Sequence, residues 1–179
     1  KRNLLLLATY AVLLVGLDVF VRYAILPGKS HNNIFIEHDP DLGWRLRPGV
    51  SLLHKTDRYS SRETINSLGF RTRERPFEKP AGTQRVVILG DSHTEGYVVN
   101  DGETCAELLE GLLARDRPVE TLALGVGGWS TDQELLCYLR YGRRFEPDLV
   151  ILQFCSNDPP FNVLDHYWRG RKPRFERHG

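Results

Sequence analysis

The sequence predicts an α/β domain built on a parallel β-sheet that has helices on both faces. Residues 85–90, 119–124 and 149–154 are mostly apolar runs, as are strands buried on both faces of a sheet. Leucine-rich segments with helical spacing lie between these runs, so that strand and helix alternate along the chain. Each run also ends in a polar or glycine-rich turn, which indicates where a strand stops.

The N-terminal segment, residues 1–26, predicts a transmembrane signal anchor. Residues 4–26 are mostly apolar and follow two basic residues, and a bilayer span needs about 20 apolar residues. Asp18 and Arg22 interrupt the run, but they lie four positions apart and can pair on one helix face. The basic end favours the cytoplasm, so we expect the following domain on the extracytoplasmic (periplasmic) side of the membrane. A cleaved signal peptide and a soluble core helix remain alternatives.

Residues 27–84 predict a juxtamembrane lead-in that packs loosely on the domain that follows. Proline–glycine pairs punctuate this segment and its charged residues are dense. Its short apolar pieces at 33–36 and 50–53 predict edge strands. The domain itself is expected to occupy residues 85–179.

Two pieces of the lead-in each couple a glycine turn to an aromatic residue and an arginine. They cover residues 41–49 and 65–71. One interpretation is a turn with an aromatic anchor in the core. The other is a lip of a binding site, with Arg45 or Arg71 facing a substrate.

Two capping boxes indicate where the helices of the domain begin. Thr104 with Glu107, and Thr131 with Glu134, have the spacing at which side chains bond backbone N–H groups reciprocally. Apolar residues at helical spacing follow both boxes. They are Leu108, Leu109, Leu112 and Leu113 in the first helix, and Leu135, Leu136, Tyr138 and Leu139 in the second.

Composition excludes some classes of function. The net charge is +1 and the basic residues form no stripe, so we expect no nucleic-acid partner. Cys105, Cys137 and Cys155 each lie in an apolar run without C-x-x-C spacing. They therefore suggest neither a zinc site nor a disulfide framework, and we interpret them as small core residues.

The carboxyl ends of the three strands are expected to meet at one edge of the sheet, where such sheets bind ligands. This edge would bring together Ser92, Gly128 and Asn157. Ser92 is a candidate nucleophile. The N–H groups of Ser92 and Gly128 and the amide of Asn157 are candidate oxyanion donors. Asp91 is expected to hold its turn through local N–H groups, and Asp158 is a second supporting carboxylate.

These segments resemble the first three motif blocks of the SGNH (GDSL-type) hydrolases. The resemblance rests on residues 87–92, on Gly128 and on residues 156–158, and it extends over about residues 84–160. It implies a flavodoxin-like three-layer αβα fold and a serine nucleophile at Ser92. No metal or cofactor is implied. Two pieces of the lead-in, residues 42–44 and 66–71, are also similar to exported, membrane-anchored bacterial members.

The sequence departs from this family in its catalytic base. The resemblance implies an Asp-x-x-His near the end of the domain, and none follows Asn157, because Asp165 and His166 are adjacent. His93 directly follows Ser92, so its ring is expected to point away from the hydroxyl. We therefore expect this chain to be C-terminally truncated, with the base beyond residue 179.

The function implied is that of a serine esterase that hydrolyses acyl esters, above all O-acetyl esters on carbohydrate, through an acyl-enzyme. Two alternatives stay open. An O-acyltransferase of cell-envelope polysaccharide would use the same acyl-enzyme. A non-catalytic envelope binding or assembly module would use none.

Overall fold

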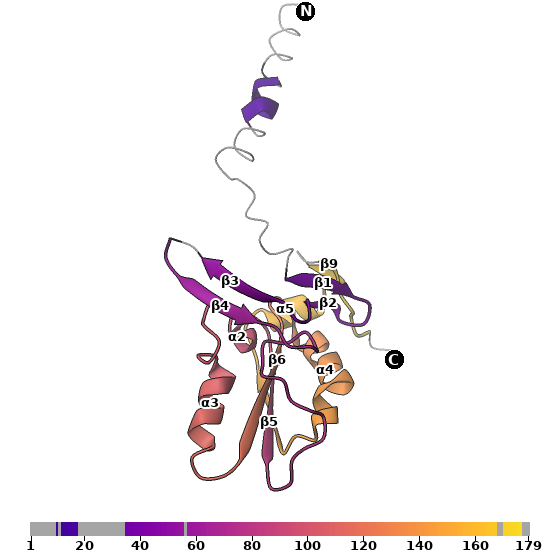
Figure 1. Ribbon diagram of the computed structural model, residues 1–179. Coiled ribbons are helices and arrows are strands. Elements are labelled where there is room, and N and C mark those ends of the chain that lie inside the picture. The colour runs from indigo at the N-terminus through magenta and orange to yellow at the C-terminus, as the bar shows by residue number, and fades with distance from the viewer. Residues whose placement is uncertain (1–9, 11, 18–34, 56, 168–169, 177–179) are drawn as a thin grey trace, which may run out of the picture. The chain divides into compact units, whose positions relative to one another are not determined.

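The computed structural model describes residues 10, 12–17, 35–55, 57–167 and 170–176 (Figure 1). The chain divides into two units, Lys1–Ile34 and Phe35–Gly179. In the first unit, residues 10 and 12–17 are helical. Most of the predicted anchor over residues 4–26 lies outside the described residues. Among the residues that are described, no helix has the length and apolar character needed to span a membrane.

The centre of the second unit is a three-stranded parallel sheet, as the alternating pattern predicted. Strand β5 (Gln84–Gly90) lies between β6 (Val119–Gly125) and β7 (Leu149–Gln153). In the register of the sheet, Gly90 is aligned with Gly125 on one side and with Gln153 on the other. The three carboxyl ends therefore lie side by side at one edge.

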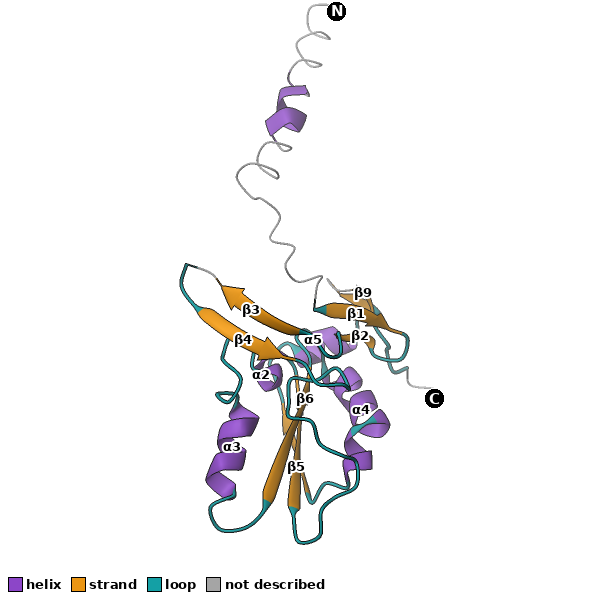
Figure 2. Ribbon diagram, viewed as in Figure 1, coloured by secondary structure: helices purple, strands orange, loops and turns teal. Residues whose placement is uncertain are grey.

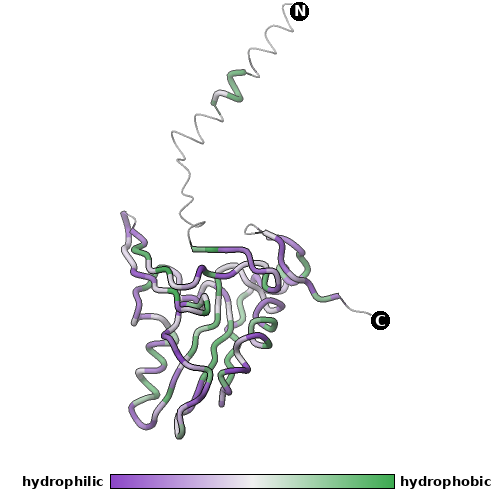
Figure 3. Tube along the Cα trace, turned by 45° about the vertical axis from the view of Figure 1, so that its right-hand side comes forward, coloured by the Kyte–Doolittle hydropathy of each residue, from purple (hydrophilic) through white to green (hydrophobic). Residues whose placement is uncertain are grey.

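Helices cover both faces of this sheet. Alternate residues of β5 point to opposite faces, so Ile88 packs with Ala106 of α3 (Cys105–Leu113), whereas Val87 packs with Cys137 of α4 (Thr131–Arg140). Figure 2 shows the two helices on opposite sides of the strands. In Figure 3 the hydrophobic residues follow the strands between them. The predicted three-layer arrangement is present in the described residues.

Short elements complete the described chain. Beyond the strand ends lie α2 (Ser92–Glu95), α5 (Asp158–Asn162), and the antiparallel pair β8 (His166–Tyr167) and β9 (Gly170–Arg171). The 3-10 helix η2 (Gly142–Phe145) instead precedes β7, at the amino end of the sheet, where the Phe145 carbonyl accepts from Arg85.

The first capping box is confirmed, but only half of the leucine stripe after it is buried. Thr104 caps α3, and its hydroxyl oxygen accepts the N–H of Glu107 at 3.3 Å. Leu109 and Leu113 pack on the sheet, whereas Leu108 and Leu112 are more than half exposed. The inner face is completed by Ala106 and Glu110. Glu110 can be buried there because its Oε2 accepts the backbone N–H of Thr121 at 2.8 Å.

The second capping box is wrong. Ser130 is the N-cap of α4 and makes no side-chain capping bond. The oxygen Oδ1 of Asp132 instead accepts the Ser130 hydroxyl and the N–H of Gln133, both at 2.8 Å. Glu134 therefore does not reach back to the helix start, and its side chain is fully buried on the inner face of α4.

The lead-in forms two antiparallel hairpins. The first joins β1 (Ile36–Asp39) to β2 (Gly43–Leu46), and the second joins β3 (Ser51–Lys55) to β4 (Ser60–Thr64). The expected edge strand over 50–53 corresponds to β3. Of the piece expected as an edge strand at 33–36, residues 33 and 34 lie outside the described residues, and Ile36 is the first residue of β1.

The expectation that the lead-in packs loosely is wrong. Five of its apolar side chains are at most 2% exposed and belong to the main hydrophobic core, together with residues of β5, β6 and α4. They are Leu42, Trp44, Leu46, Ile65 and Phe70. Burial of side chains of this size stabilises a fold by about 1.5–3 kcal/mol each, so the lead-in is an integral part of the core.

In both glycine–aromatic–arginine pieces the aromatic residue is an anchor in the core, and the arginine is bonded within the protein. Trp44 and Phe70 are buried. Arg45 pairs with Glu37 across the first hairpin. Arg71 is 3% exposed and donates to the carbonyl groups of Gly96 and Val99. Its guanidinium therefore holds the loop that follows α2.

Only one of the three cysteines is the core residue that the sequence predicted. Cys137 is buried, Cys105 is exposed and Cys155 is half-buried, and all three are free thiols. Cys105 occupies the first position of α3, and Cys155 follows the end of β7, so both lie where their apolar runs leave the core.

Candidate active site

Ser92 begins α2, directly beyond the carboxyl end of the central strand. Asp91 is the N-cap of this helix, and its Oδ1 accepts the backbone N–H of His93 at 3.0 Å. This is the turn-holding role that the sequence predicted for Asp91. The Ser92 side chain is half-buried, and its hydroxyl makes no hydrogen bond to another described residue. It is therefore available to a substrate.

Two glycines allow α2 to rest directly on the strand ends. A Cβ atom at Gly125 would lie 2.6 Å from Thr94 Cβ and 2.8 Å from the Gly90 carbonyl oxygen. A Cβ atom at Gly90 would collide with the Thr94 hydroxyl. Real Cβ atoms do not approach other atoms so closely. The absence of side chains at these two positions therefore fixes the place of α2, and with it the place of Ser92.

Side chains of α2 also bond the turns on either side. The hydroxyl of Thr94 donates to Oε1 of Gln153, at the end of β7, at 2.7 Å. The Oε2 atom of Glu95 accepts the N–H of Gly127, just beyond β6, at 2.5 Å. The helix is thus connected to both neighbouring strand ends, and Ser92 lies between them.

The turn after β6 carries Gly128, which adopts a left-handed backbone conformation with φ of +82°. Glycine has no Cβ and adopts this conformation without strain. The N–H of Trp129 closes the turn onto the carbonyl of Val126 at 3.0 Å. Trp44 holds it from outside, since its indole N–H donates to the Gly127 carbonyl at 3.1 Å. The Gly128 N–H is bound by no described residue.

The turn after β7 carries Asn157, the N-cap residue of α5. Asn157 is half-buried, and its side chain bonds to no described residue. Asp158 is fully buried, and its Oδ2 accepts the N–H of Cys155 at 3.0 Å. Asp158 therefore closes the turn on which Asn157 is carried, which is a supporting role.

This turn lies against the turn of Ser92. Ligand atoms of Asp91, His93 and Cys155 all lie within 4.8 Å of one another. The residues on both sides of Ser92 are thus close to the residue that begins the Asn157 turn. The fold places the N–H of Ser92, the N–H of Gly128 and the amide of Asn157 around one edge. That these three groups form an oxyanion hole stays a prediction.

A group of buried carboxylates lies behind this edge, and sequence reasoning missed its central member. Burial raises the pKa of Glu134 to about 8, and the negative charges of Asp158, Asp91 and Asp132 add to the increase. Burial also raises the pKa of Asp158, again with a contribution from Asp91 and Asp132. The sequence did not indicate that Glu134 is buried, because its spacing from Thr131 also fits a capping box.

The described histidines make their hydrogen bonds to residues other than Ser92. The His93 side chain is 67% exposed, and its Nδ1 lies 3.1 Å from Asp91 Oδ1, so its ring is turned to its own capping residue. The Nδ1 atom of His166 lies 2.9 Å from Asp165 Oδ1, and the His166 side chain is exposed. No hydrogen bond joins either ring to the Ser92 hydroxyl.

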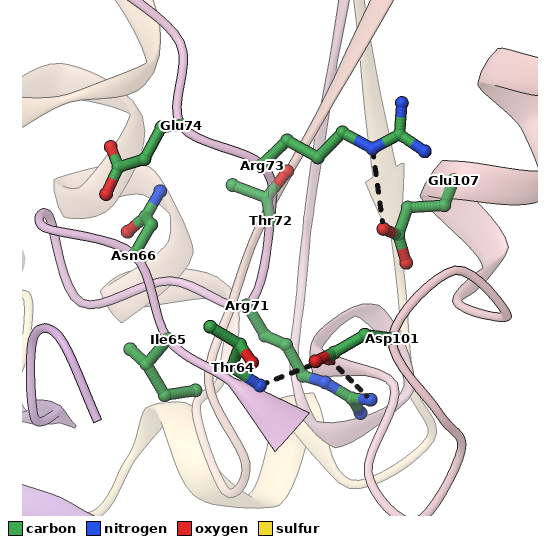
Figure 4. Close-up of a pocket in the computed structure, with 9 residues that line it drawn as sticks. All are labelled: Thr64, Ile65, Asn66, Arg71, Thr72, Arg73, Glu74, Asp101 and Glu107. Atoms are coloured by element: carbon green, nitrogen blue, oxygen red, sulfur yellow. Dashed lines mark hydrogen bonds and ion pairs between the residues drawn. The ribbon is translucent and has the colours of Figure 1, made fainter. Parts of the chain in front are cut away.

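A separate cavity of about 240 Å³ lies between the lead-in and α3 (Figure 4). Its lining includes none of the three candidate oxyanion donors. Figure 4 shows Arg71 pointing to Asp101 and Arg73 to Glu107, so two arginines of the lining are held by carboxylates. These ion pairs connect the lead-in to α3 and to the loop before it, so the arginines of the lining have a structural role.

Comparison with known proteins gives one family. The model of the GDSL-like Lipase/Acylhydrolase family matches residues 88–177, which is just over half of the chain. The chain belongs to this family. The range that this GDSL-like protein shares with the family model contains Ser92, Gly128 and Asn157. The comparison with curated proteins finds no match.

Proposed function

We propose that this GDSL-like protein is a serine esterase that cleaves acyl esters, above all O-acetyl esters of carbohydrate, through an acyl-enzyme on Ser92. The observation that carries the proposal is the placement of α2. Its first residue is Ser92, and its side chains bond the ends of both neighbouring strands. The family to which the chain belongs supports acylhydrolase chemistry in general.

In the proposed reaction, the Ser92 oxygen attacks the ester carbonyl carbon. A bond forms between that oxygen and the carbon, the proton of the hydroxyl passes to a base, and the carbonyl oxygen becomes an oxyanion. The C–O bond to the alcohol then breaks, and the base returns the proton to the departing alcohol oxygen. Water then attacks the carbonyl carbon of the acyl-enzyme with the help of the same base, the acid leaves, and the Ser92 hydroxyl is restored.

The oxyanion would be held by the N–H groups of Ser92 and Gly128 and by the amide of Asn157. Donors fixed in place before the reaction stabilise the developing charge, and the loss of one such donor costs about 10²–10³ in kcat. The hydrogen bonds that hold α2 and the Gly127 carbonyl support this role, because they fix the backbone on which the donors are carried.

We propose that the base is a histidine beyond residue 179. The described histidines make no bond to Ser92. Among the described residues, β7 pairs only with β5, and its side chains Leu149 and Leu152 are 53% and 46% exposed. A following strand would pair with the outer edge of β7, and its crossover helix would cover apolar side chains on a face of the sheet.

The proposed substrate and location rest on the predicted anchor over residues 4–26 and on the resemblance of the lead-in to exported bacterial members. An enzyme held on the extracytoplasmic side of the membrane would meet acetylated carbohydrate of the cell surface.

A fluorophosphonate probe tests the nucleophile in the full-length protein. We expect covalent labelling that disappears in Ser92→Ala and persists in Ser156→Ala, since Ser156 is exposed and adjacent to Asn157. Labelling that survives in Ser92→Ala would contradict the assignment. A full-length protein that neither labels nor hydrolyses an activated ester would instead be the non-catalytic module.

An activated acetyl ester then separates hydrolysis from transfer. With water and a sugar acceptor present together, the proposal expects mostly free acetate. Mostly acetylated sugar would make the protein an O-acyltransferase. The chain that ends at residue 179 is expected to show little or no turnover, and robust turnover by it would contradict a base beyond that residue.

A further inference from the structure

Three side chains of different ligand type converge beside Ser92. They are the carboxylate of Asp91, the imidazole of His93 and the thiol of Cys155, and their ligand atoms all lie within 4.8 Å of one another. Asp91 and His93 flank Ser92, and Cys155 follows β7, so the fold of the sheet brings the cysteine to them. The spacing of the cysteines along the chain did not indicate a metal site.

The distance between the Asp91 and His93 ligand atoms fits the coordination of a small cation. Asp91 Oδ1 and His93 Nδ1 are 3.1 Å apart. Two ligands at about 2.0–2.1 Å from a tetrahedral zinc ion are separated by about 3.3 Å. A small adjustment of the two side chains would therefore let both bind one ion. Cys155 is half-buried and His93 is exposed, so an ion can enter from solvent.

The ligand set favours zinc over the hard cations. Magnesium and calcium prefer oxygen ligands alone, whereas zinc binds thiolate, imidazole and carboxylate together. Three protein ligands leave the fourth tetrahedral position to water or to a substrate atom, which is the pattern of an open zinc site rather than of a structural one.

The surrounding charge also favours a cation. Asp91, Asp132 and Asp158 are buried carboxylates, each at most 6% exposed. Lys172 pairs with Asp132, and His93 is the only described basic side chain within ion-pair distance of Asp91. A divalent ion beside Asp91 would offset the negative charge of these carboxylates.

We propose that Asp91, His93 and Cys155 form a binding site for one Zn²⁺ ion. The proposal rests on the geometry and the charge of these side chains, and it does not depend on the reaction proposed for Ser92.

Cobalt substitution tests the binding without any need for activity. The full-length Ser92→Ala protein, kept reduced by a phosphine, is titrated with Co²⁺ and then with Zn²⁺. We expect one equivalent of Co²⁺ with a thiolate-to-cobalt absorption band, which Zn²⁺ displaces. Cys155→Ser is expected to abolish the band, and His93→Gln is expected to weaken binding by about 100-fold or more.

Matched controls are available for both ligands. Cys105 is an exposed thiol and His166 is an exposed imidazole. Neither Cys105→Ser nor His166→Gln should change the band. A band that persists in Cys155→Ser, a band lost in Cys105→Ser, or no stoichiometric binding would each overturn the site.

Discussion

Trp129 donates its indole N–H to the backbone carbonyl of Trp44 at 2.9 Å, although the two residues lie 85 positions apart. Trp44 in turn donates its own indole N–H to the carbonyl of Gly127 at 3.1 Å. Both side chains are fully buried. A strand of the lead-in and the turn that carries Gly128 are thus held together by two buried hydrogen bonds, and the lead-in fixes one wall of the candidate site.

Trp44→Phe should therefore destabilise the domain and lower activity together. The phenylalanine keeps an aromatic ring but leaves the buried Gly127 carbonyl without its indole donor, which costs about 1–3 kcal/mol of unfolding free energy. Urea denaturation gives this difference. Leu53→Ala is the control, because Leu53 is 62% exposed and its loss should change stability by less than about 0.5 kcal/mol. Equal stability of Trp44→Phe and the wild-type protein would show that the bond does not support the turn.

Gly125→Ala should displace α2 and reduce labelling of Ser92. Its methyl group would lie 2.6 Å from Thr94 Cβ, so the helix must move or the sheet must open. Overpacking of this kind costs about 1–3 kcal/mol. Gly111→Ala is a control that should change the free energy of unfolding in the opposite direction. Gly111 lies in α3, and a methyl group there would have nothing within 4 Å, so alanine should stabilise by about 0.5–1 kcal/mol.

Thermal unfolding of both glycine variants and their rates of fluorophosphonate labelling check this pair. If Gly125→Ala were as stable and as reactive as the wild-type protein, the close contact between α2 and the strand ends would not position Ser92.

Sequence patterns were sufficient for the sheet and for the turns that follow it. The strands are continuous apolar runs, and Ser92, Gly128 and Asn157 each follow one within a few residues. These features are local, so one stretch of sequence contains them. The burial of Trp44 depends on Trp129 and Gly127, which are distant in the sequence. The residue pattern of a short strand does not predict contacts of this kind.

Glu134 and Cys155 show the same limit. A glutamate three residues after a threonine is typical of a helix start, yet packing of α4 on the sheet decided that Glu134 points inward. Cys155 lies more than sixty positions from Asp91 in the sequence, and only the pairing of β5 with β7 brings it close.

Arg85 was predicted only as the first residue of a strand, and its side chain is fully buried. Its guanidinium donates to Glu120 at 2.7 Å and to four backbone carbonyls, those of Pro76, Phe77, Glu78 and Phe145. It therefore joins the end of the lead-in to the sheet.

Arg85→Lys should be strongly destabilising, although it keeps the charge. Lysine has three donors and no planar fork, so at least two buried acceptors would lose their partner, at a cost of about 2–5 kcal/mol. Chemical denaturation measures the loss. Arg115→Lys, at an exposed position, should change stability by no more than about 0.5 kcal/mol. Similar stabilities for the two variants would be incompatible with a central role for Arg85.

Glu134 makes the stability of the domain depend on pH. Its pKa of about 8, raised chiefly by burial, exceeds the ordinary glutamate value of 4.5. The folded state therefore keeps a proton that the unfolded state releases above that lower value. Stabilisation by the neutral carboxyl is complete below about pH 4.5 and is lost as pH rises through about 8, with a slope of at most about 1.4 kcal/mol per pH unit.

Glu134→Gln should remove this dependence, since the amide is similar in shape and does not ionise. The free energy of unfolding of the variant minus that of the wild-type protein should rise steadily between about pH 5 and pH 8. Urea denaturation at several pH values gives this difference, and subtraction cancels the other titrating groups common to both proteins, apart from the effect that the Glu134 charge has on Asp158. A difference that stays constant over this range would mean that Glu134 ionises in the folded protein as readily as in the unfolded chain. In that case the carboxylates behind Ser92 would not repel one another strongly enough to retain a proton.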